Sequence, residues 1–341
     1  MHMADALISP AVGGTMWAAT VGLVGYCSKK VKEDLDDRKI PLMGVVGAFI
    51  FAAQMINFTI PGTGSSGHLG GGMILAILLG PYAAFLTIAS VLTIQALFFA
   101  DGGLLALGCN IFNLGFFPSF VAYPFIYKRI VGNNPSNGLL FTGATTAAIV
   151  GLQLGAFCVV LQTLLSGISE LPFSAFVLIM QPIHLAIGIV EGIATTAVVV
   201  FVWKARPEII KAAIESTPIE KLSIRKVLIG LLVATVITGG ALSWFASSHP
   251  DGLEWSIFKA AGVEELKEPE KGVHASLATI QEKTAFLPDY AFKPQGAEPT
   301  AEGYKGWPAV DAGTTASGLI GGALTLLMAG LIGFLLRHRK R

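Results

Sequence analysis

The sequence predicts an all-α polytopic membrane protein, and three observations favour that fold class. Only 13% of the residues are charged and 53% are hydrophobic, whereas a soluble domain carries about 25% charged residues. The mean hydropathy of the chain is +0.68. Runs of about 20 apolar residues, the length that crosses a bilayer, recur along the sequence. This composition excludes a disordered chain, a nucleic-acid binder with a basic face and most soluble enzymes.

Nine apolar runs are expected to form helices in chain order. The first run has no basic segment before it, because the first lysine is Lys29; we therefore expect a retained span rather than a cleaved signal peptide. The third run is short and closed by Gly80-Pro81, which predicts a tilted or re-entrant piece surrounded by protein. The runs cover residues 10–28, 40–57, 72–80, 82–100, 103–127, 139–166, 176–203, 227–247 and 313–336.

The placement of basic residues predicts the topology. If residue 1 lies outside, the short inside segments hold 17 of the 23 Lys and Arg residues, as the positive-inside rule requires. The other six fall in 249–312, an external segment long enough to escape that rule. The inside segments are 28–39, 128–138, 204–226 and 337–341. We therefore predict a multi-pass protein of a prokaryotic plasma membrane, with its N-terminus outside and its C-terminus cytoplasmic.

Composition divides the chain into two units. Residues 1–204 form a dense seven-span bundle, and residues 205–226 form a polar cytoplasmic linker that we expect to be partly helical. Residues 227–341 form a two-span unit around the external segment 249–312. The sequence contains no inverted repeat of the kind that marks many secondary transporters.

A glycine-rich motif at residues 62–67 has the pattern G-x-G-x-x-G but lacks the context of a dinucleotide site. Such a site needs a preceding strand and an acidic residue about 20 positions later. Here an apolar run precedes the motif, and no Asp or Glu occurs between Asp37 and Asp101. The phosphate-binding motif G-x-x-x-x-G-K-[ST] is also missing from the sequence, so we expect no bound nucleotide. Because no nucleophile and base are placed together either, the chain is not expected to be an enzyme.

The first residues offer an unusual chelate for a metal ion. Met1 is expected to be retained before the bulky His2, which leaves a free α-amine. That amine, the His2 amide nitrogen and His2 Nδ1 close a five- and a six-membered ring, so the three nitrogens become nearly coplanar. A planar nitrogen site suits Ni(II) or Cu(II), and His68 in the following external loop is the expected fourth ligand. The alternative is that His2 is accidental. The cysteines lack the C-x-x-C spacing of a thiolate site: Cys27, Cys109 and Cys158.

The seventh span carries ionisable groups. His184 and Glu191 share one helical face with Gln181, and intramembrane ionisable groups are functional candidates. Two interpretations remain open from the sequence. The residues form either a hydrogen-bonded brace inside the bundle or a proton relay.

At this point the chain resembles a known family. Met1–Leu7, the loop Ser66–Gly72 and the run from His68 to Pro81 are similar to the cobalt/nickel (CbiM/NikM) substrate-binding S component of energy-coupling factor (ECF) transporters. That resemblance covers residues 1–204. The segment Pro250-Asp251-Gly252-Leu253-Glu254 resembles the PDGLE signature of the two-span accessory N component, which is here fused to the S component.

The resemblance implies a metal site made by Met1, His2 and His68. It implies that the chain captures Ni(II) from outside and delivers it for ATP-driven import, with a transmembrane coupling subunit and cytoplasmic ATPases as partners. Co(II) uptake is the nearest alternative, and a proton-coupled secondary transporter using His184 and Glu191 is a further one. The role of the external segment stays open between covering the site, recruiting metal and bracing the bundle. A ridge of small residues on the first span is a candidate docking surface for the coupling subunit: Gly14, Ala18 and Gly22.

Overall fold

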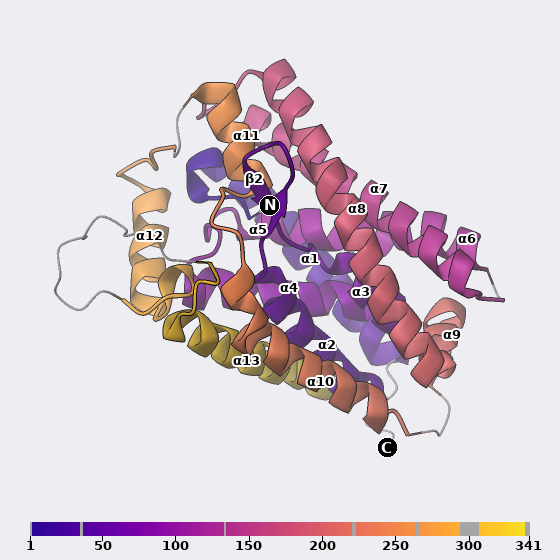
Figure 1. Ribbon diagram of the computed structural model, residues 1–341. Helices are drawn as coiled ribbons and strands as arrows, with labels where there is room; N and C mark the ends of the chain where they lie inside the picture. Colours follow the sequence, from indigo (N-terminus) through magenta and orange to yellow (C-terminus); the bar gives the residue numbers. More distant parts are fainter. Residues whose placement is uncertain are drawn as a thin grey trace.

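The computed structural model describes residues 2–34, 37–132, 134–219, 223–262, 266–293 and 307–337. Met1, the first residue of the predicted metal site, lies outside the described residues. The described part of the chain is mostly helical, as predicted (Figure 1).

Each of the nine predicted apolar runs forms a helix. Proline at 118 and at 124 lies in the fifth of these runs, where part of the helix has the wide turns of a π-helix. The helices are α1 (Pro10–Asp34), α2 (Lys39–Gln54), α3 (Gly72–Leu79), α4 (Pro81–Phe99), α5 (Leu107–Ile111) continued by the π-helical Phe112–Tyr127 and α6 (Lys128–Val131), α7 (Asn137–Ser166), α8 (Phe173–Ala205), α10 (Arg225–Gly240) and α13 (Ala312–Leu336).

Not every helix is long enough to cross a membrane alone. Within the described ranges, five segments have the required length and hydropathy: Pro81–Phe99, Leu107–Val131, Asn137–Ser166, Phe173–Ala205 and Ala312–Leu336. The eight residues of α3 extend only about 12 Å at 1.5 Å per residue, so α3 does not cross alone, in agreement with the short piece predicted there. The full count of seven spans plus two stays a prediction.

The structure adds elements that the apolar runs do not predict. Residues 58–67 form an antiparallel hairpin of β1 (Phe58–Ile60) and β2 (Ser65–Gly67), so the all-α class is wrong for this loop and right for the bundle. The linker contains α9 (Pro207–Glu215) and is therefore partly helical, as predicted. Segment 249–312 contains α11 (Gly252–Ala261) and α12 (Val273–Thr284).

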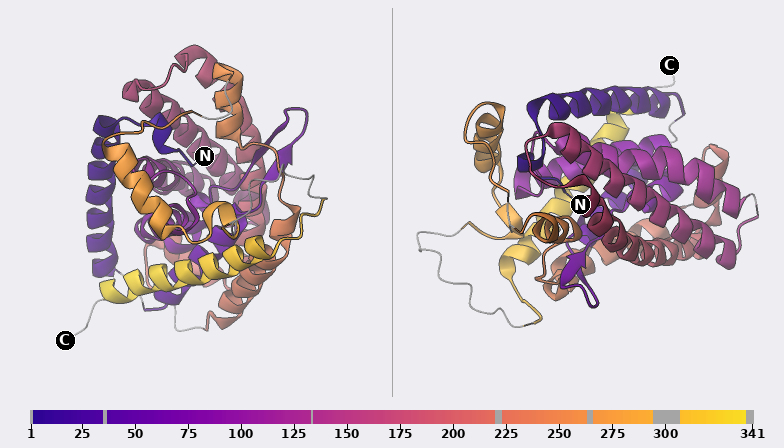
Figure 2. Two further views of the ribbon diagram at one scale, coloured as in Figure 1. Left: turned by 90° about the vertical axis from the view of Figure 1, so that its left-hand side faces the viewer. Right: turned by 90° about the horizontal axis from the view of Figure 1, so that it is seen from above.

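Close helix packing holds the C-terminal unit together and joins it to the N-terminal bundle. A Cβ atom on Gly318 of α13 would lie 2.3 Å from the carbonyl oxygen of Gly239 in α10, and one on Gly44 of α2 would lie 2.9 Å from the carbonyl oxygen of Leu326 in α13. Small residues let helix backbones approach in this way. Figure 2 shows α13 crossing beside α10. The C-terminal unit is therefore built onto the side of the N-terminal bundle.

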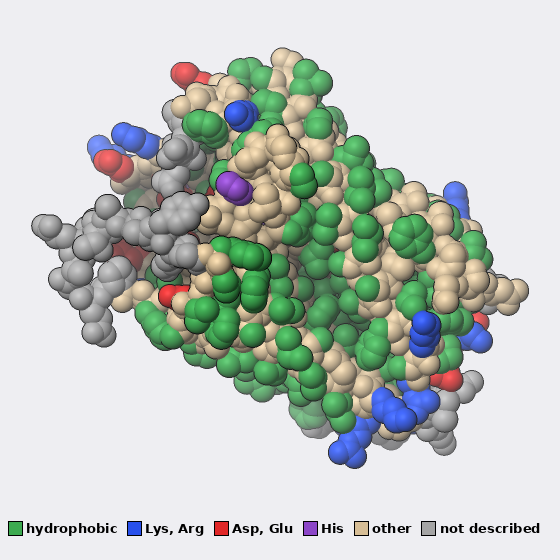
Figure 3. All heavy atoms as spheres, viewed as in Figure 1, with side chains coloured by type: hydrophobic (Ala, Val, Ile, Leu, Met, Phe, Trp, Pro, Cys, Tyr) green, Lys and Arg blue, Asp and Glu red, His purple; other side chains and the backbone are tan. Residues whose placement is uncertain are grey.

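The two ends of the molecule differ in character. The helices α11 and α12 lie at the same end as the N-terminal segment (Figures 1 and 2). At the opposite end, near α6 and α9, Lys and Arg side chains gather beyond a broad hydrophobic face (Figure 3). Large apolar side chains such as Leu165 of α7 and Leu178 of α8 are more than two-thirds exposed, which is the pattern of helices that face lipid.

Candidate metal centre

The N-terminal segment is fixed inside the protein. The Met3 N–H donates to Oδ1 of Asn110 at 2.8 Å, and Nδ2 of Asn110 donates back to the Met3 carbonyl at 3.2 Å. The Gly103 N–H donates to the same carbonyl at 2.9 Å. Because the Met3 side chain is completely buried, the backbone that follows His2 has one defined path.

Asp5 ties this segment to the start of α5. Its carboxylate accepts the N–H groups of Leu105 at 3.1 Å and Ala106 at 2.9 Å. These N–H groups precede the first helical residue, Leu107, and the first N–H groups of a helix lack partners within it. Hydrogen bonds to a carboxylate are stronger than those between neutral groups. Asp5 is 2% exposed, so this contact is shielded from water.

His68 is placed by the hairpin and the loop after it. Gly62 and Gly64 adopt positive φ angles of 78° and 75°, which glycine adopts without steric cost and which close the turn between β1 and β2. After His68, the N–H groups of Gly70 and Gly71 donate to the two carboxylate oxygens of Glu191 at 2.9 and 3.0 Å. Glu191 is 2% exposed, and it therefore holds the loop from within α8.

His2 and His68 lie together, as the sequence analysis predicts for a shared site. Their rings are stacked, with centroids 5.0 Å apart and an interplanar angle of 12°. Each side chain is 8% exposed. Burial lowers the pKa of His2 and of His68 to about 3, so both imidazoles are neutral at neutral pH. The neutral imidazole is the form that binds a metal ion.

Two acidic residues contact this histidine pair. Nδ1 of His2 lies 3.2 Å from Oδ1 of Asp101; because the ring is neutral, this contact is a hydrogen bond rather than an ion pair. Nε2 of His68 lies 3.8 Å from Oδ2 of Asp251, beyond hydrogen-bond range. Asp101 also accepts a hydrogen bond from the Tyr290 hydroxyl. The C-terminal unit thus contributes Asp251 and Tyr290 to the surroundings of the two histidines.

The hairpin that carries His68 is docked on the C-terminal unit. The Ser66 N–H donates to the Pro250 carbonyl at 2.8 Å, and the Ser66 hydroxyl donates to the His249 carbonyl at 2.8 Å. Nε1 of Trp255 in α11 donates to the Thr63 carbonyl at 3.1 Å. The PDGLE segment therefore fixes the hairpin from outside, while Glu191 fixes it from within.

The ring nitrogens of the two histidines have different surroundings. Nδ1 of His68 contacts the carbonyl of Leu69 at 3.1 Å; because a carbonyl only accepts, Nδ1 carries the hydrogen and Nε2 keeps its lone pair. In His2, Nε2 is buried without a hydrogen-bond partner among the described residues. The predicted chelate uses Nδ1 of His2, so its formation requires this nitrogen to leave Asp101.

The remaining predicted participants are distributed as follows. Met1 lies outside the described residues, and no group of three His, Cys, Asp or Glu side chains in the described ranges forms a ready-made metal site. Nε2 of His274 lies 2.9 Å from the Ile8 carbonyl, so His274 braces the N-terminal segment. The His249 side chain is exposed. Of the predicted ligand set, the described structure brings together His2 and His68.

Asp101, Asp251 and Tyr290 were not singled out by the sequence analysis as neighbours of the site. Asp101 could have been found, because it is the sole acidic residue between Asp37 and Glu170. An isolated carboxylate in such an apolar region needs a specific partner. Tyr290 carries no comparable signal, because a tyrosine among apolar and polar neighbours in residues 286–293 is ordinary.

Glu191→Gln is expected to weaken Ni(II) binding by the purified chain about tenfold, within the range typical of residues that orient a metal ligand. Glutamine keeps one oxygen for one glycine N–H but turns an NH₂ group toward the other. Isothermal titration with Ni(II) measures the change. Glu170→Gln, on an exposed loop, is the matched control. Unchanged affinity in Glu191→Gln would show that these two hydrogen bonds do not position His68.

The five long apolar helices of the described chain define a multi-pass membrane protein. The buried pair His2 and His68 lies at one end of its bundle. The family model described as "Cobalt uptake substrate-specific transmembrane region" (CbiM) matches residues 2–209, and the PDGLE domain model matches residues 225–338. Because the first match covers more than half of the chain, the protein belongs to the CbiM family and carries a fused PDGLE domain.

Curated relatives agree with this assignment. A putative metal transport protein of Haloquadratum walsbyi is 35% identical over 64% of this chain and 96% of its own length. A putative fused nickel transport protein (NikMN) of Archaeoglobus fulgidus is 36% identical over 62% of this chain and 68% of its own length. A cobalt transport protein (CbiM) of Geobacter sulfurreducens is 28% identical over 62% of this chain and 61% of its own length.

A solved structure shares the fold over part of this chain. The crystal structure of a transition metal transporter is 32% identical, covers 61% of this chain and 95% of its own, and superposes with a TM-score of 0.54. The predicted resemblance is thus confirmed, including the fused architecture. The family is one of metal transport through a membrane, and the relatives of this chain are nickel and cobalt transport proteins.

Proposed function

We propose that the chain captures Ni(II) from outside the cell at a square-planar nitrogen site. The ligands are the Met1 amine, the His2 amide nitrogen, His2 Nδ1 and His68 Nε2. The observation that supports this assignment most directly is the burial of His2 and His68 against each other, with both imidazoles neutral. The anchored backbone at Met3 holds His2 beside His68.

Nickel is the preferred cargo because of the ligand geometry. Four nitrogens in a plane suit Ni(II), whereas Co(II) has a weaker preference for this arrangement. Co(II) remains the alternative cargo, since the relatives include both nickel and cobalt transport proteins. Deprotonation of the His2 amide upon binding makes the affinity rise with pH.

The PDGLE unit covers and braces the site in this proposal. Asp251 lies beside His68, Tyr290 holds Asp101 beside His2, and Ser66 connects the hairpin to the PDGLE segment. Both carboxylates lie beside the ring nitrogens proposed as ligands, so they surround the incoming cation with negative charge. These contacts favour covering and bracing over metal recruitment by His249 or His274.

Delivery requires partners that supply energy. The sequence has no phosphate-binding loop for ATP, and we propose import driven by an ECF coupling subunit and cytoplasmic ATPases. Gly14, Ala18 and Gly22 are exposed on α1, which leaves this ridge open for a coupling subunit. The proposed orientation, with the N-terminus outside, agrees with the basic side chains near α6 and α9 (Figure 3). The unit boundaries at residues 204 and 227 belong to the same proposal.

The secondary-transporter alternative has less support. A proton relay needs a carboxylate that can exchange partners, whereas both oxygens of Glu191 accept backbone N–H groups of the His68 loop. His184 donates Nδ1–H to the Met180 carbonyl at 2.8 Å. Glu191 therefore fits the role of a brace.

Extending the chain by one residue before Met1 tests the proposed site. The extension moves the free amine away from His2, so Ni(II) affinity is expected to fall by at least about a hundredfold, more than the loss typical of a residue outside the ligand set. Isothermal titration of the purified full chain with Ni(II) and Co(II) gives the affinities. One residue added after Arg341 is the control. An extended chain that binds Ni(II) with unchanged affinity would exclude the Met1–His2 chelate.

A further inference from the structure

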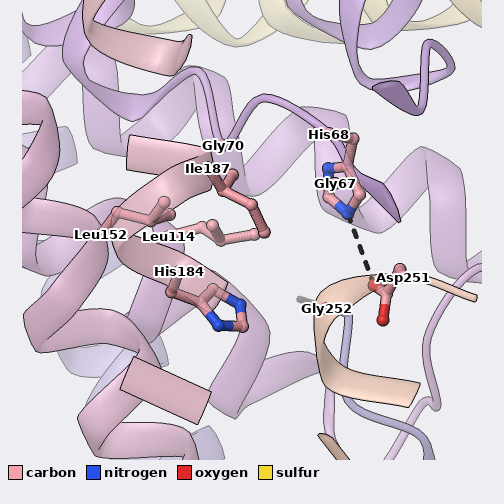
Figure 4. Close-up of a pocket in the computed structure, with 9 residues that line it drawn as sticks. All are labelled: Gly67, His68, Gly70, Leu114, Leu152, His184, Ile187, Asp251 and Gly252. Carbon is pink, nitrogen blue, oxygen red and sulfur yellow. Dashed lines mark ion pairs between the residues drawn. The ribbon is translucent and has the colours of Figure 1, made fainter. Parts of the chain in front are cut away.

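A small cavity lies directly behind His68 (Figure 4). It has room for about a single water-sized particle. The hairpin and the loop after it, the π-helical segment, α7, α8 and the start of α11 line it. Most of its wall is apolar or backbone, but His68, His184 and Asp251 contribute polar groups to it. The lining residues are Gly67, His68, Gly70, Leu114, Leu152, His184, Ile187, Asp251 and Gly252.

His184 presents an unused lone pair at this cavity. Its Nδ1 lies 2.8 Å from the Met180 carbonyl. A carbonyl only accepts, so Nδ1 carries the hydrogen and Nε2 of the neutral ring keeps its lone pair. Nε2 is buried without a hydrogen-bond partner among the described residues, and the residue is 1% exposed. A buried polar atom left unpaired costs about 1–3 kcal/mol, so this arrangement calls for a ligand.

His68 and Asp251 stand across the cavity from His184. Figure 4 shows the His184 ring turned toward Gly252, with His68 and Asp251, joined by a dashed line, on the far side. A Cβ atom on Gly252 would lie 3.3 Å from Cε1 of His184, so the PDGLE glycine leaves space that a larger residue would fill. Two imidazoles and one carboxylate therefore surround the same small volume.

We propose that His184 is a further ligand for the transported cation, which occupies a second, weaker position between His184 Nε2, His68 Nε2 and the Asp251 carboxylate. This inference rests on the proposed function, because His68 serves both positions and hands the ion from one to the other. Two imidazoles and a carboxylate suit divalent first-row metals such as Co(II) and Ni(II). Water completes the coordination.

Weak binding at this second position follows from its surroundings. In the described ranges, no three His, Cys, Asp or Glu side chains are already close enough together to hold a metal ion. The three proposed ligands must therefore move toward the ion to bind it. Leu114, Leu152 and Ile187 line the same cavity, and an apolar wall makes an incompletely coordinated charge costly. A position through which an ion passes must bind weakly enough to release it.

The test uses the full-length His2→Ala chain, in which the planar chelate is removed, titrated with Co(II). Visible absorption of Co(II) reports binding by imidazole and carboxylate ligands. His2→Ala protein is expected to bind one Co(II) ion, and the double variant His2→Ala/His184→Gln is expected to bind it at least about tenfold more weakly, a change of about 1.4 kcal/mol. Glutamine keeps a hydrogen-bond donor for the Met180 carbonyl. His184→Leu in the same background is the second variant.

His2→Ala/His249→Gln is the matched control, since the exposed His249 side chain does not line the cavity, and its Co(II) spectrum is expected to equal that of His2→Ala. The inference is overturned if His2→Ala protein binds no Co(II), or if its Co(II) affinity is the same with and without His184. Ni(II) binding by the unmodified chain distinguishes failure of the proposed function from failure of the second position. If the unmodified chain binds no Ni(II), the proposed function fails. If it binds Ni(II) but the Co(II) spectra are the same with and without His184, only the second position fails.

Discussion

Replacing His68 by alanine is expected to weaken Ni(II) binding by the purified chain at least about a hundredfold, which exceeds the range for residues that only orient a ligand. The substitution removes one of the four proposed nitrogens and leaves the stacked His2 ring without its neighbour. It also removes the imidazole that faces both Asp251 and the His184 cavity. Isothermal titration with Ni(II) gives the affinity, and visible absorption reports whether any bound ion remains square-planar.

His249→Gln is the control for His68→Ala, because it removes an exposed imidazole close to the PDGLE segment and is expected to leave the affinity unchanged. A His68→Ala chain with native affinity would mean that another group, such as water, fills the fourth corner. Loss of affinity in both variants would instead point to metal recruitment by the external segment.

Gly103→Ala is expected to weaken Ni(II) binding about tenfold to a hundredfold, as expected for a change that displaces a ligand without removing it. A Cβ atom at this position would lie 1.9 Å from Oδ1 of Asp5 and 2.5 Å from the Asp5 backbone nitrogen. The space is occupied by the Asp5 backbone and by its carboxylate, which is held by two hydrogen bonds. The N-terminal segment must therefore move, and His2 moves with it. The same overpacking costs about 1–3 kcal/mol of folding stability.

Gly138→Ala is the matched control, because a Cβ atom at Gly138 would meet no atom within 4 Å. Both variants are compared by Ni(II) titration and by thermal unfolding in detergent. The result that contradicts the prediction is a Gly103→Ala chain with native Ni(II) affinity, since it would mean that the path of residues 2–8 does not control the metal site.

The helices could be predicted because each depends on local sequence. An apolar run of sufficient length must form its hydrogen bonds internally in a membrane, and all nine runs are helical. The hairpin at residues 58–67 could not be predicted in the same way. Its strands are three residues each, too short for a recognisable alternation, and they are held by Pro250 and Trp255 from the second unit.

The candidate site was partly predictable for the same reason. The chelate rings proposed for the first two residues follow from covalent geometry alone, and His68 is an isolated histidine in the loop after the second apolar run. The second unit was predicted from composition, but its contact with the site was not. Asp251 meets His68 and Tyr290 meets Asp101 through contacts between residues far apart in the chain.

The sequence by itself determined that this protein is a helical membrane protein, and its motifs indicated the family to which it belongs. Those features follow from hydropathy, charge placement and short motifs, which act over neighbouring residues. Only the tertiary structure decided that His2 and His68 stack, that Glu191 braces their loop and that the PDGLE segment closes a cavity lined by His184. The physical reason is that these side chains meet only after distant helices pack, and no local preference fixes which polar groups will then share a buried space.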